Sequence, residues 1–419
     1  MNKKTILLLS DHPLSTSGVG TQTRWLINGL VNTGKYSFRC FGAAVKHDNY
    51  DTISVNQDFI IKPTDGFGDK NLLRKTLAQV RPDILLLFTD PRFFYWVWEM
   101  ADEIKQICPI AYWHLWDNPP WPDYNNVLYQ STDLINCINY PTYEMVHERF
   151  PEKTNYIPHS VPQELFKELP QQQVEDFKKK LLGKDRLDHF TVLYVSRNAR
   201  RKMTADILKS WQMFMKDLKE KHGHQKVSII MHCDPLDPEG TNLYSVIDML
   251  GIKESVVFSK DRIAFEEMNL LYNMCDTIVN RSSNEGFGLP ILEAKMCGKP
   301  VIAIKTGGLT RQVEDHITGE HYGIGLEPEV RSMVGNLMIP YIYEDFISHE
   351  TLSKSFMEIY DWGPEKRREV GQKAMKHAHR DYIMENVIND WDVSLTKLTD
   401  TWQNPETKPA QWEMKVLDV

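Results

Sequence analysis

The sequence of 419 residues contains no apolar run long enough to cross a bilayer, which takes about 20 consecutive residues. Its longest strongly apolar runs are short, such as the one from Ile84 to Phe88. The chain begins with a basic lead, but the apolar stretch from Ile6 to Leu9 is too short for a secretory signal. We therefore expect no transmembrane segment, and we interpret residues 5–9 as a first buried strand.

Cysteine is scarce as well. The closest two of the six cysteines, Cys275 and Cys297, are 22 residues apart. Zinc sites and redox motifs pair cysteines at much shorter spacings, so this pattern argues against both. We expect buried, reduced thiols, which are typical of a cytoplasmic protein, and we expect no metal site.

Positive charge is not in excess. The chain carries 49 Lys and Arg against 57 Asp and Glu, a net charge of −8. Proteins that coat nucleic acid through their overall charge have the opposite sign, so this class is disfavoured, although a local basic site stays open. Hydrophobic residues make up 42% of the chain and charged residues 25%. These values are typical of a folded protein, and the length predicts two or three domains.

Short β-rich runs alternate with helical patterns along most of the chain. The expected strands lie at 5–9, 37–42, 84–88, 110–113 and 134–138, and again at 191–195, 227–231, 256–258, 277–279 and 301–304. Longer helical stretches, such as 93–107 and 204–221, separate them. This alternation predicts parallel sheets with helices on both faces. The fold class is therefore α/β, with two doubly wound, Rossmann-like domains that face each other across a cleft.

The alternation pauses where prolines 158, 162 and 170 punctuate the chain, which is typical of a linker. We place the domain boundary there, with an N-terminal domain at 1–162 and a C-terminal domain at 163–383. The end of the chain is mostly helical, and a polar tail follows at 403–419.

The most informative segment reads Asn-Glu-Gly-Phe-Gly-Leu-Pro over residues 284–290 and follows the strand expected at 277–279. Its two glycines allow a close approach of the backbone to a ligand, and Pro290 suits the first turn of a helix. The N–H groups at such a helix start bind phosphate, and Glu285 and Glu293 could accept hydrogen bonds from sugar hydroxyls. A helix-capping loop with two solvated glutamates is the structural alternative.

This segment, together with residues 297–303 and the Thr-Gly-Gly run at 306–308, resembles the nucleotide-sugar site of family-4 glycosyltransferases. These are retaining enzymes of the GT-B architecture, such as glycogen synthase and phosphatidylinositol mannosyltransferase. The resemblance implies a hexosyl- or pentosyltransferase that uses a nucleoside-diphosphate sugar as donor substrate, without a cofactor or a metal. It implies that Glu293 holds the ribose, that Glu285 contacts the donor sugar, and that sugar and diphosphate face the backbone of Phe287, Gly288 and Leu289.

The resemblance places further site residues directly after the strand expected at 191–195. Family members carry arginine, four residues and then lysine at this position, and Arg197 and Lys202 fit that spacing. Breaking the sugar–diphosphate bond builds negative charge on the leaving phosphate, and preorganised charge of this kind is worth about 3–4 kcal/mol per key group in other enzymes. Arg197 and Lys202 are therefore candidate catalytic residues. Arg200 and Arg201 stay ambiguous, and a solvated basic loop is the structural alternative.

The first half of the chain carries two matches to the same family. Gly18 and Gly20 lie in a loop between the first strand and the first helix, where the resemblance implies a cradle for the donor phosphates and the acceptor. A dinucleotide fingerprint would need a third glycine where Thr23 stands, so NAD binding is disfavoured. His114 ends the strand expected at 110–113, and the resemblance places it beside the donor sugar as a catalytic residue.

A proline-stiffened loop with three tryptophans surrounds His114. Trp116 and Trp121 could form a stacking platform for a sugar or a base, and Asp117 could contact the acceptor or orient the histidine. Packing of this loop against its own domain is the alternative explanation. On the platform hypothesis, these three residues belong to the acceptor site.

The resemblance implies which domain binds each substrate, and it implies a mechanism. The donor binds mainly to the C-terminal domain and the acceptor mainly to the N-terminal domain, on which a last helix at 384–402 packs back. The acceptor hydroxyl attacks the face that the phosphate leaves, so the configuration of the sugar is retained. Two departures from the family pattern stand out: His159-Ser160 replaces the usual Asn-Gly, and residues 323–343 replace a short connection.

The residues leave the partners open beyond a nucleotide-sugar donor and a hydroxyl acceptor, which could be a glycan, a lipid or a small molecule. One alternative is a viral-type DNA glycosyltransferase that acts on hydroxymethylated bases, although the net charge counts against DNA. Another is a sugar-nucleotide epimerase of the same fold, which needs no acceptor.

Overall fold

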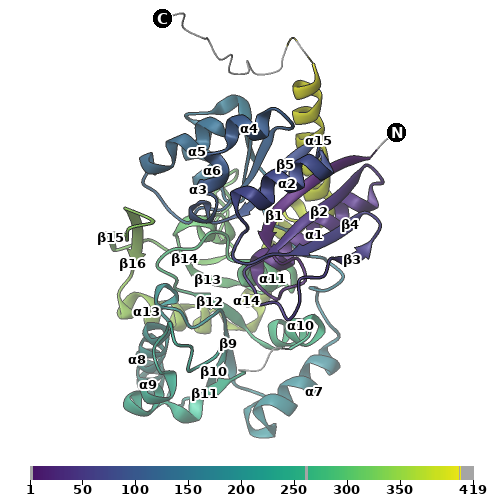
Figure 1. The fold of residues 1–419 in the computed structure, drawn as a ribbon. Helices are drawn as coiled ribbons and strands as arrows, with labels where there is room; N and C mark the ends of the chain where they lie inside the picture. The colour runs from purple at the N-terminus through teal and green to yellow at the C-terminus, as the bar shows by residue number, and fades with distance from the viewer. Residues whose placement is uncertain (1–2, 260–262, 405, 407–419) are drawn as a thin grey trace, which may run out of the picture. The chain divides into compact units, whose positions relative to one another are not determined.

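The computed structural model describes residues 3–259, 263–404 and 406, and the chain forms two compact units (Figure 1). Unit 1 comprises Met1–His159, Gly335–Tyr341 and Met384–Val419, and unit 2 comprises Ser160–Val334 and Ile342–Ile383. The boundary that we expected after residue 162 falls close to the first division. Of the expected tail, residue 405 and residues 407–419 lie outside the described part of the chain.

Unit 1 is built on an eight-stranded sheet with the order β3-β4-β2-β1-β5-β6-β7-β8. Its strands are β1 (Lys4–Asp11), β2 (Tyr36–Ala43), β3 (Ile53–Asn56), β4 (Phe59–Pro63), β5 (Ile84–Thr89), β6 (Ile110–His114), β7 (Leu134–Cys137) and β8 (Thr154–Tyr156). The pairs are parallel except for β3 against β4. In the central strand β1, residues 6–9 are completely buried, as a parallel strand covered on both faces requires.

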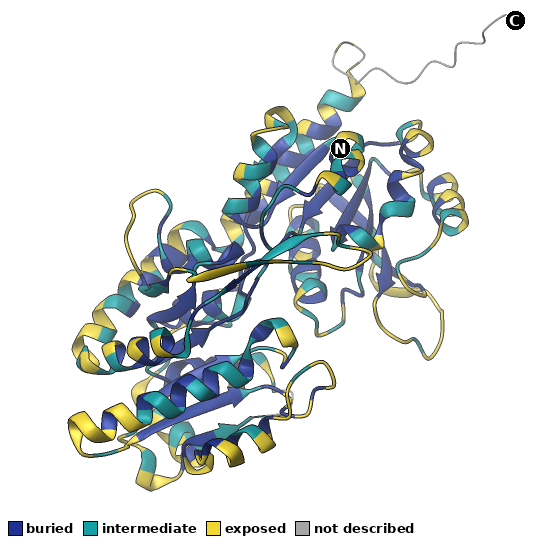
Figure 2. Cartoon of the chain, turned by 90° about the vertical axis from the view of Figure 1, so that its left-hand side faces the viewer, coloured by how far each residue is buried: buried dark blue, intermediate teal, exposed yellow. Residues whose placement is uncertain are grey.

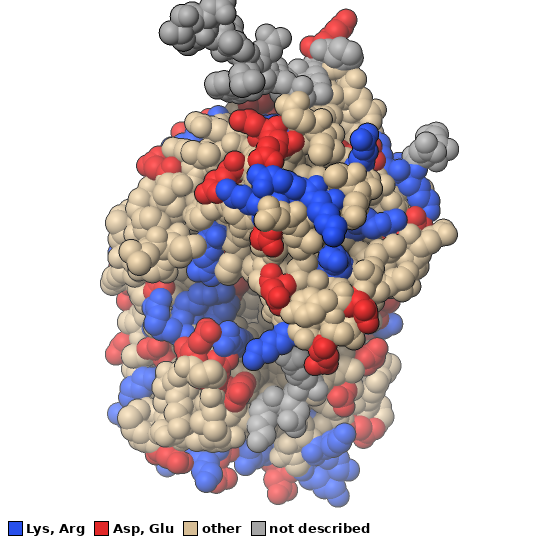
Figure 3. Space-filling view, viewed as in Figure 1, with Lys and Arg blue, Asp and Glu red and all other residues tan. Residues whose placement is uncertain are grey.

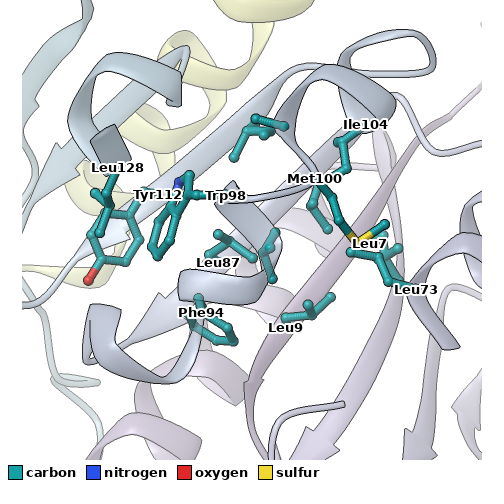
Figure 4. Packing of buried hydrophobic residues seen from close by; sticks show 14 of the residues in the cluster. Leu7, Leu9, Leu73, Leu87, Phe94, Trp98, Met100, Ile104, Tyr112 and Leu128 are labelled. Carbon is teal, nitrogen blue, oxygen red and sulfur yellow. The ribbon is translucent and has the colours of Figure 1, made fainter. Parts of the chain in front are cut away.

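Helices cover both faces of this sheet. They are α1 (Gly18–Asn32), α2 (Lys70–Val80), α3 (Tyr95–Trp98), α4 (Ala101–Lys105), α5 (Asn126–Ser131), α6 (Tyr140–His147) and α15 (Met384–Gln403). Figure 4 shows the core on one face, where Leu7 and Leu9 of β1 pack with Leu73 of α2 and with Phe94 and Trp98. Each such side chain, once buried, contributes about 1.5–3 kcal/mol to folding.

The single helix expected at 93–107 is wrong. The chain instead forms a 3-10 turn, Pro91–Phe93, followed by the short helices α3 and α4. Aromatic residues have low helix propensity because the preceding turn restricts their side chains, and Phe94 and Trp98 both enter the core. Core packing therefore outweighs continuation of the helix here.

Unit 2 contains a six-stranded parallel sheet with the order β11-β10-β9-β12-β13-β14. Its strands are β9 (Phe190–Val195), β10 (Val227–His232), β11 (Val256–Phe258), β12 (Thr277–Asn280), β13 (Val301–Ile304) and β14 (Gly323–Leu326). The helices of this unit are α7 (Gln171–Leu182), α8 (Thr204–His222), α9 (Leu243–Leu250), α10 (Phe265–Met274), α11 (Leu289–Met296), α12 (Thr310–Val313), α13 (His349–Asp361) and α14 (Gly363–Asp381). Figure 2 shows the sheets in the dark blue of buried residues, with exposed residues on the outer faces of the helices.

The chain between β14 and α13 forms an antiparallel hairpin of β15 (Val330–Val334) and β16 (Ile342–Phe346). This hairpin accounts for most of the segment 323–343, for which the sequence suggested no structure. The strands belong to unit 2, whereas the tip, Gly335–Tyr341, counts with unit 1. There the Tyr124 hydroxyl donates to the carbonyl oxygen of Tyr341 at 2.8 Å.

The predicted fold class is confirmed, because each unit is a doubly wound α/β layer structure on a mainly parallel sheet. Among the described residues, none of the helices combines the length and the apolar character that a bilayer crossing needs.

Candidate active site

The strand order of unit 2 creates a switch point between β9 and β12. The chain leaves β9 toward β10 on one side, whereas β12 continues toward β13 on the other side. Open α/β sheets bind ligands beyond the carboxyl ends of strands at such a point. The loop after β9 contains Arg197 and Lys202, and the loop after β12 contains Glu285. The topology therefore brings two separately predicted motifs to one edge of the sheet.

Two glycine-containing turns pack backbone to backbone at this edge. The N–H of Gly308 donates to the carbonyl oxygen of Glu285 at 2.9 Å. A Cβ at position 308 would lie 2.4 Å from the Cα of Phe287 and 2.5 Å from the carbonyl oxygen of Gly286. Only glycine fits so close an approach. The run at 306–308 thus holds the 285–288 loop in place.

Helix α11 begins where this loop ends. Gly288 precedes it with φ +91° and has no side chain to cap the helix, and a proline lies in the first turn. The start of a helix carries the positive end of the helix dipole, although here Ile291 and Leu292 donate their N–H groups to the carbonyl oxygen of Gly288 at 3.0 and 3.4 Å. The backbone from Phe287 to Leu289 therefore presents an anion-binding helix start, although the Phe287 side chain is buried and its ring lies edge-on to Tyr382.

Glu285 and Lys202 form a direct ion pair across the two loops. Both side chains are largely buried, and Arg201 lies 3.9 Å from the same carboxylate oxygen. Burial by itself would raise the pKa of the Glu285 carboxyl, but the charges of Lys202 and Arg201 outweigh it and lower that pKa. The site therefore holds an ionised carboxylate between two cations.

Arg197 lies in a different arrangement from the one its spacing suggested. Its guanidinium forms two hydrogen bonds with the carboxylate of Asp237, at 2.6 and 3.1 Å, and contacts Glu239 at 3.3 Å. Its charge is thus compensated within the protein. Arg201, which the sequence left ambiguous, is the arginine beside Glu285 and also donates to the carbonyl oxygen of Asn284 at 2.8 Å.

Glu293 lies on α11, one turn beyond its start. Its carboxylate accepts a hydrogen bond of 2.5 Å from the hydroxyl of Tyr272, a buried residue of α10. Burial raises the pKa of the Glu293 carboxyl to about 7, and the hydrogen bond from Tyr272 only partly offsets this effect. The carboxyl is thus held in one orientation, with an acceptor oxygen that a ribose hydroxyl could use.

Gly18 and Gly20 lie in the first turn of α1, in unit 1. The Ser17 hydroxyl accepts from the N–H of Gly20 at 2.9 Å and donates to Asp11 at 2.7 Å. A Cβ at position 20 would lie 2.6 Å from the carbonyl oxygen of His12. The glycine at position 20 therefore allows a tight loop, and the serine already caps the helix start.

His114 ends β6 and is completely buried. Its Nε2 lies 2.8 Å from the hydroxyl of Tyr129, and its ring lies edge-on to Tyr112. Burial lowers the pKa of the imidazole to about 3, so the ring is neutral. In this structure His114 presents no surface to a ligand.

The tryptophan loop packs largely against its own unit. Trp116 is buried, and its carbonyl oxygen accepts from Asn139 at 2.8 Å. The indole of Trp121 contacts the ring of Tyr129, with the Arg149 guanidinium over it at 4.3 Å. Asp117 is half-buried. This geometry favours the packing alternative over an open stacking platform.

Two residues of the site in unit 2 escaped the sequence analysis. Arg201 stayed ambiguous beside Arg197, because spacing along a loop says nothing of where each side chain points. Tyr272 lies 21 residues before Glu293 on another helix, and no sequence signal joins the two. The switch point, by contrast, follows from the strand order alone.

Basic and acidic side chains are mixed over the face that Figure 3 presents. This distribution agrees with the net charge of −8. Near the site, the cations at positions 197, 200 and 202 each have a carboxylate partner within the protein. The arrangement therefore suits a small anionic group better than an extended polyanion.

Residues 173–329 match the family model described as "Glycosyl transferases group 1". The D-inositol 3-phosphate glycosyltransferase of Stackebrandtia nassauensis is 43% identical over 77 residues, which cover 18% of this chain and 17% of that protein. The protein of the same name from Corynebacterium jeikeium is 35% identical over 107 residues, 25% of each chain. The aligned stretches thus span a quarter or less of these relatives.

Solved structures resemble the chain over nearly its whole length. HepE (Alr3699) of Anabaena, in complex with UDP and glucose, aligns with a TM-score of 0.67 at 17% identity, covering 95% of this chain and 100% of that chain. The sucrose-phosphate synthase of Thermosynechococcus elongatus aligns with a TM-score of 0.69 at 17% identity, with the same coverage. At this identity the likeness shows the GT-B fold. The stretch from residue 173 to residue 329, which carries the Lys202–Glu285 pair and Glu293, is similar to group 1 glycosyltransferases.

Proposed function

We propose that the protein transfers a sugar from a nucleoside-diphosphate sugar to a hydroxyl acceptor, with retention of configuration. The observation that carries this proposal is the Lys202–Glu285 ion pair, with Arg201 beside it, at the switch point of unit 2. Glu285 lies on the loop that leads into α11, Lys202 lies in the 3-10 turn after β9, and both are within the family match. Cations, a fixed carboxylate and the positive end of a helix dipole are the groups that this chemistry needs.

In the proposed complex, the diphosphate binds at the start of α11, where the positive end of the helix dipole favours an anion. Glu293 accepts hydrogen bonds from the ribose, in the orientation that Tyr272 holds. Glu285 accepts hydrogen bonds from hydroxyls of the donor sugar. The donor is a substrate, and the proposal includes neither a cofactor nor a metal.

The bond between the anomeric carbon and the phosphate oxygen then breaks, and the acceptor oxygen bonds to the same face of that carbon. The proton of the acceptor hydroxyl passes to an oxygen of the leaving phosphate. Lys202 and Arg201 stabilise the negative charge that develops on this phosphate. Arg197 orders the loop through Asp237, so Arg201 takes the part that the sequence assigned to Arg197.

The acceptor is a hydroxyl compound that binds mainly to unit 1. The relatives are named for D-inositol 3-phosphate, so we propose a small polyol phosphate as the first acceptor class to test. We also propose a reducing, cytoplasmic location, because the six cysteines are buried and unpaired.

The proposal is tested by thermal unfolding with UDP, GDP and ADP and with their glucose and mannose derivatives. A ligand that binds the native state raises the midpoint by mass action, so we expect at least one nucleoside diphosphate to do so. A panel in which no nucleotide shifts the midpoint would overturn the proposal. The stabilising donor is then incubated alone and with inositol 3-phosphate. Isomerised donor without acceptor indicates an epimerase, whereas a glycosylated acceptor whose anomeric NMR signal matches the donor indicates retaining transfer.

A further inference from the structure

Strand β16 carries two adjacent carboxylates, Glu344 and Asp345, that are almost completely buried although the hairpin around them is largely exposed. Neighbouring residues of a strand point to opposite faces of the sheet, so the two side chains reach different partners. Burying a carboxylate is costly unless charged or hydrogen-bonding groups compensate it. Both carboxylates have such partners: Glu344 pairs with Arg200 of the loop after β9, and Asp345 contacts Thr306 after β13 and Arg331 of β15.

Glu344 holds the loop that follows β9. Its two oxygens accept from both terminal nitrogens of Arg200, at 3.0 and 2.6 Å. Arg200 opens the 3-10 turn Arg200–Lys202, which ends with the lysine that pairs with Glu285. A bidentate pair of this kind fixes orientation as well as distance. Glu344 therefore sets the position from which Lys202 reaches the site.

Asp345 holds the loops that follow β12 and β13. Its Oδ2 accepts from the hydroxyl of Thr306 at 2.7 Å, and its N–H donates to the carbonyl oxygen of Ser283 at 2.7 Å. The N–H of Ser283 in turn donates to the carbonyl oxygen of Arg201 at 2.7 Å. Thr306 leads into the turn whose Gly308 donates to Glu285. One strand thus connects three separate loops at the switch point.

We infer that Glu344 and Asp345 are positioning residues. They hold the loops after β9, β12 and β13 in the arrangement that binds the diphosphate, and we call these two side chains with their contacts the brace. This inference rests on the proposed function, and it assigns a role to the hairpin that interrupts the usual connection. The brace does not include Glu293, whose orientation comes from Tyr272 on α10. Loss of the brace should therefore weaken recognition of the diphosphate and leave recognition of the nucleoside intact.

The test is calorimetric titration of Glu344→Ala and Asp345→Ala with UDP and GDP, and with UMP and GMP as matched monophosphates. We expect the affinity for the bound diphosphate to fall about tenfold, as loss of hydrogen bonds to charged groups implies, whereas monophosphate affinity stays within about twofold. Should either alanine variant fail to fold, Glu344→Gln and Asp345→Asn replace it. Asp345→Asn keeps one acceptor for Thr306 and should recover part of the affinity.

Two control variants separate the brace from general effects on the hairpin and on unit 2. Met333→Ala shortens an exposed side chain of β15 and leaves the partners of Glu344 and Asp345 in place. Lys226→Ala breaks an exposed ion pair with Asp188, before the starts of β10 and β9. Both should keep wild-type diphosphate affinity. If the brace variants lose affinity for diphosphate and monophosphate equally, or if folded brace variants keep wild-type affinity, the inference is wrong while the proposed function still stands. A wild-type protein that binds neither diphosphate overturns the proposed function and the brace with it.

Discussion

Glu285 is the residue in which burial and charge compete most directly. Its carboxylate is largely buried, yet Lys202 and Arg201 hold its pKa below the ordinary value. Such an arrangement keeps a fixed negative charge beside two positive ones before any ligand binds. The cations can then meet a diphosphate without reorganisation, which is the main source of electrostatic stabilisation in enzymes.

Replacing Lys202 by alanine should abolish most of the activity without unfolding the protein. The variant loses the cation nearest Glu285, and we expect donor turnover to fall about 100-fold or more, as for other groups that stabilise developing charge. Turnover is measured as nucleoside diphosphate release, with circular dichroism to check the fold. Lys226→Ala, which lies away from the switch point, should keep wild-type turnover. Equal rates in both variants would contradict the assigned role.

Glu293 should make stability depend on pH in a defined window. Its pKa is raised from 4.5 to about 7 in the folded protein, so between these values the native state holds a proton that the unfolded chain has released. Stability therefore falls as pH rises through this window, by up to about 1.4 kcal/mol per pH unit. Below pH 4.5 this loss of stability is absent, and above about pH 7 it is complete.

The measurement is urea unfolding of the wild type and of Glu293→Gln from pH 4.5 to pH 8. Glutamine cannot ionise, so the variant should gain stability relative to the wild type as pH increases. A difference in unfolding free energy that stays constant over this range would show that Glu293 titrates normally. Donor binding should weaken in the variant at every pH, because glutamine keeps a single acceptor oxygen for both the Tyr272 hydroxyl and the ribose.

The loops at the carboxyl edge of unit 2 owe their precision to glycine. Gly308→Ala would place a Cβ within 2.6 Å of two backbone atoms of the neighbouring loop, and backbone cannot move aside as a side chain can. We expect about 1–3 kcal/mol of destabilisation, typical of overpacking, together with loss of nucleotide binding. Thermal unfolding and calorimetry measure both effects. Gly319→Ala serves as control for nucleotide binding: no atom lies within 4 Å of its added Cβ, and its φ of +70° should cost about 1 kcal/mol of stability while nucleotide binding stays normal.

Most strands of both sheets could be predicted because buried parallel strands read as short, continuous apolar runs, whereas β3, β4, β8 and β14 were not predicted. Residues 6–9 and 84–88 are such runs, and both are completely buried. The hairpin could not be predicted in this way, since β15 is mostly exposed and shows little apolar alternation. Within the site, the glycine loop was predictable from residue type, whereas the partner of each arginine was not. Arg197 and Arg201 differ only in which carboxylate their side chains reach.

Helix α15, which follows unit 2 in the sequence, contributes to the core of unit 1. Helix α15 packs on α1, where a Cβ at Gly29 would lie 2.3 Å from the Ile388 side chain. Trp391 of the same helix is completely buried, with its ring edge-on to Trp113 at 5.1 Å. Residues far apart in the sequence thus share one core, and α15 is part of the unit rather than an appendage.

Trp391→Ala should therefore destabilise unit 1 strongly, by about 3–5 kcal/mol, the usual cost of deleting a buried large aromatic side chain. Urea unfolding followed by the fluorescence of the remaining tryptophans measures this loss. Val393→Ala on the same helix is the matched control, because Val393 is 59% exposed and should cost little. Equal stability of the two variants would contradict the packing of α15.

The proposed function depends on where the diphosphate binds. The most direct measurement is a crystal structure of the protein with the nucleoside-diphosphate sugar that stabilises it most. We predict the diphosphate at the start of α11, with the Lys202 ammonium on a phosphate oxygen and the Glu293 carboxyl on the ribose. Density for the diphosphate at any other place, with Lys202 still paired only to Glu285, would contradict the account.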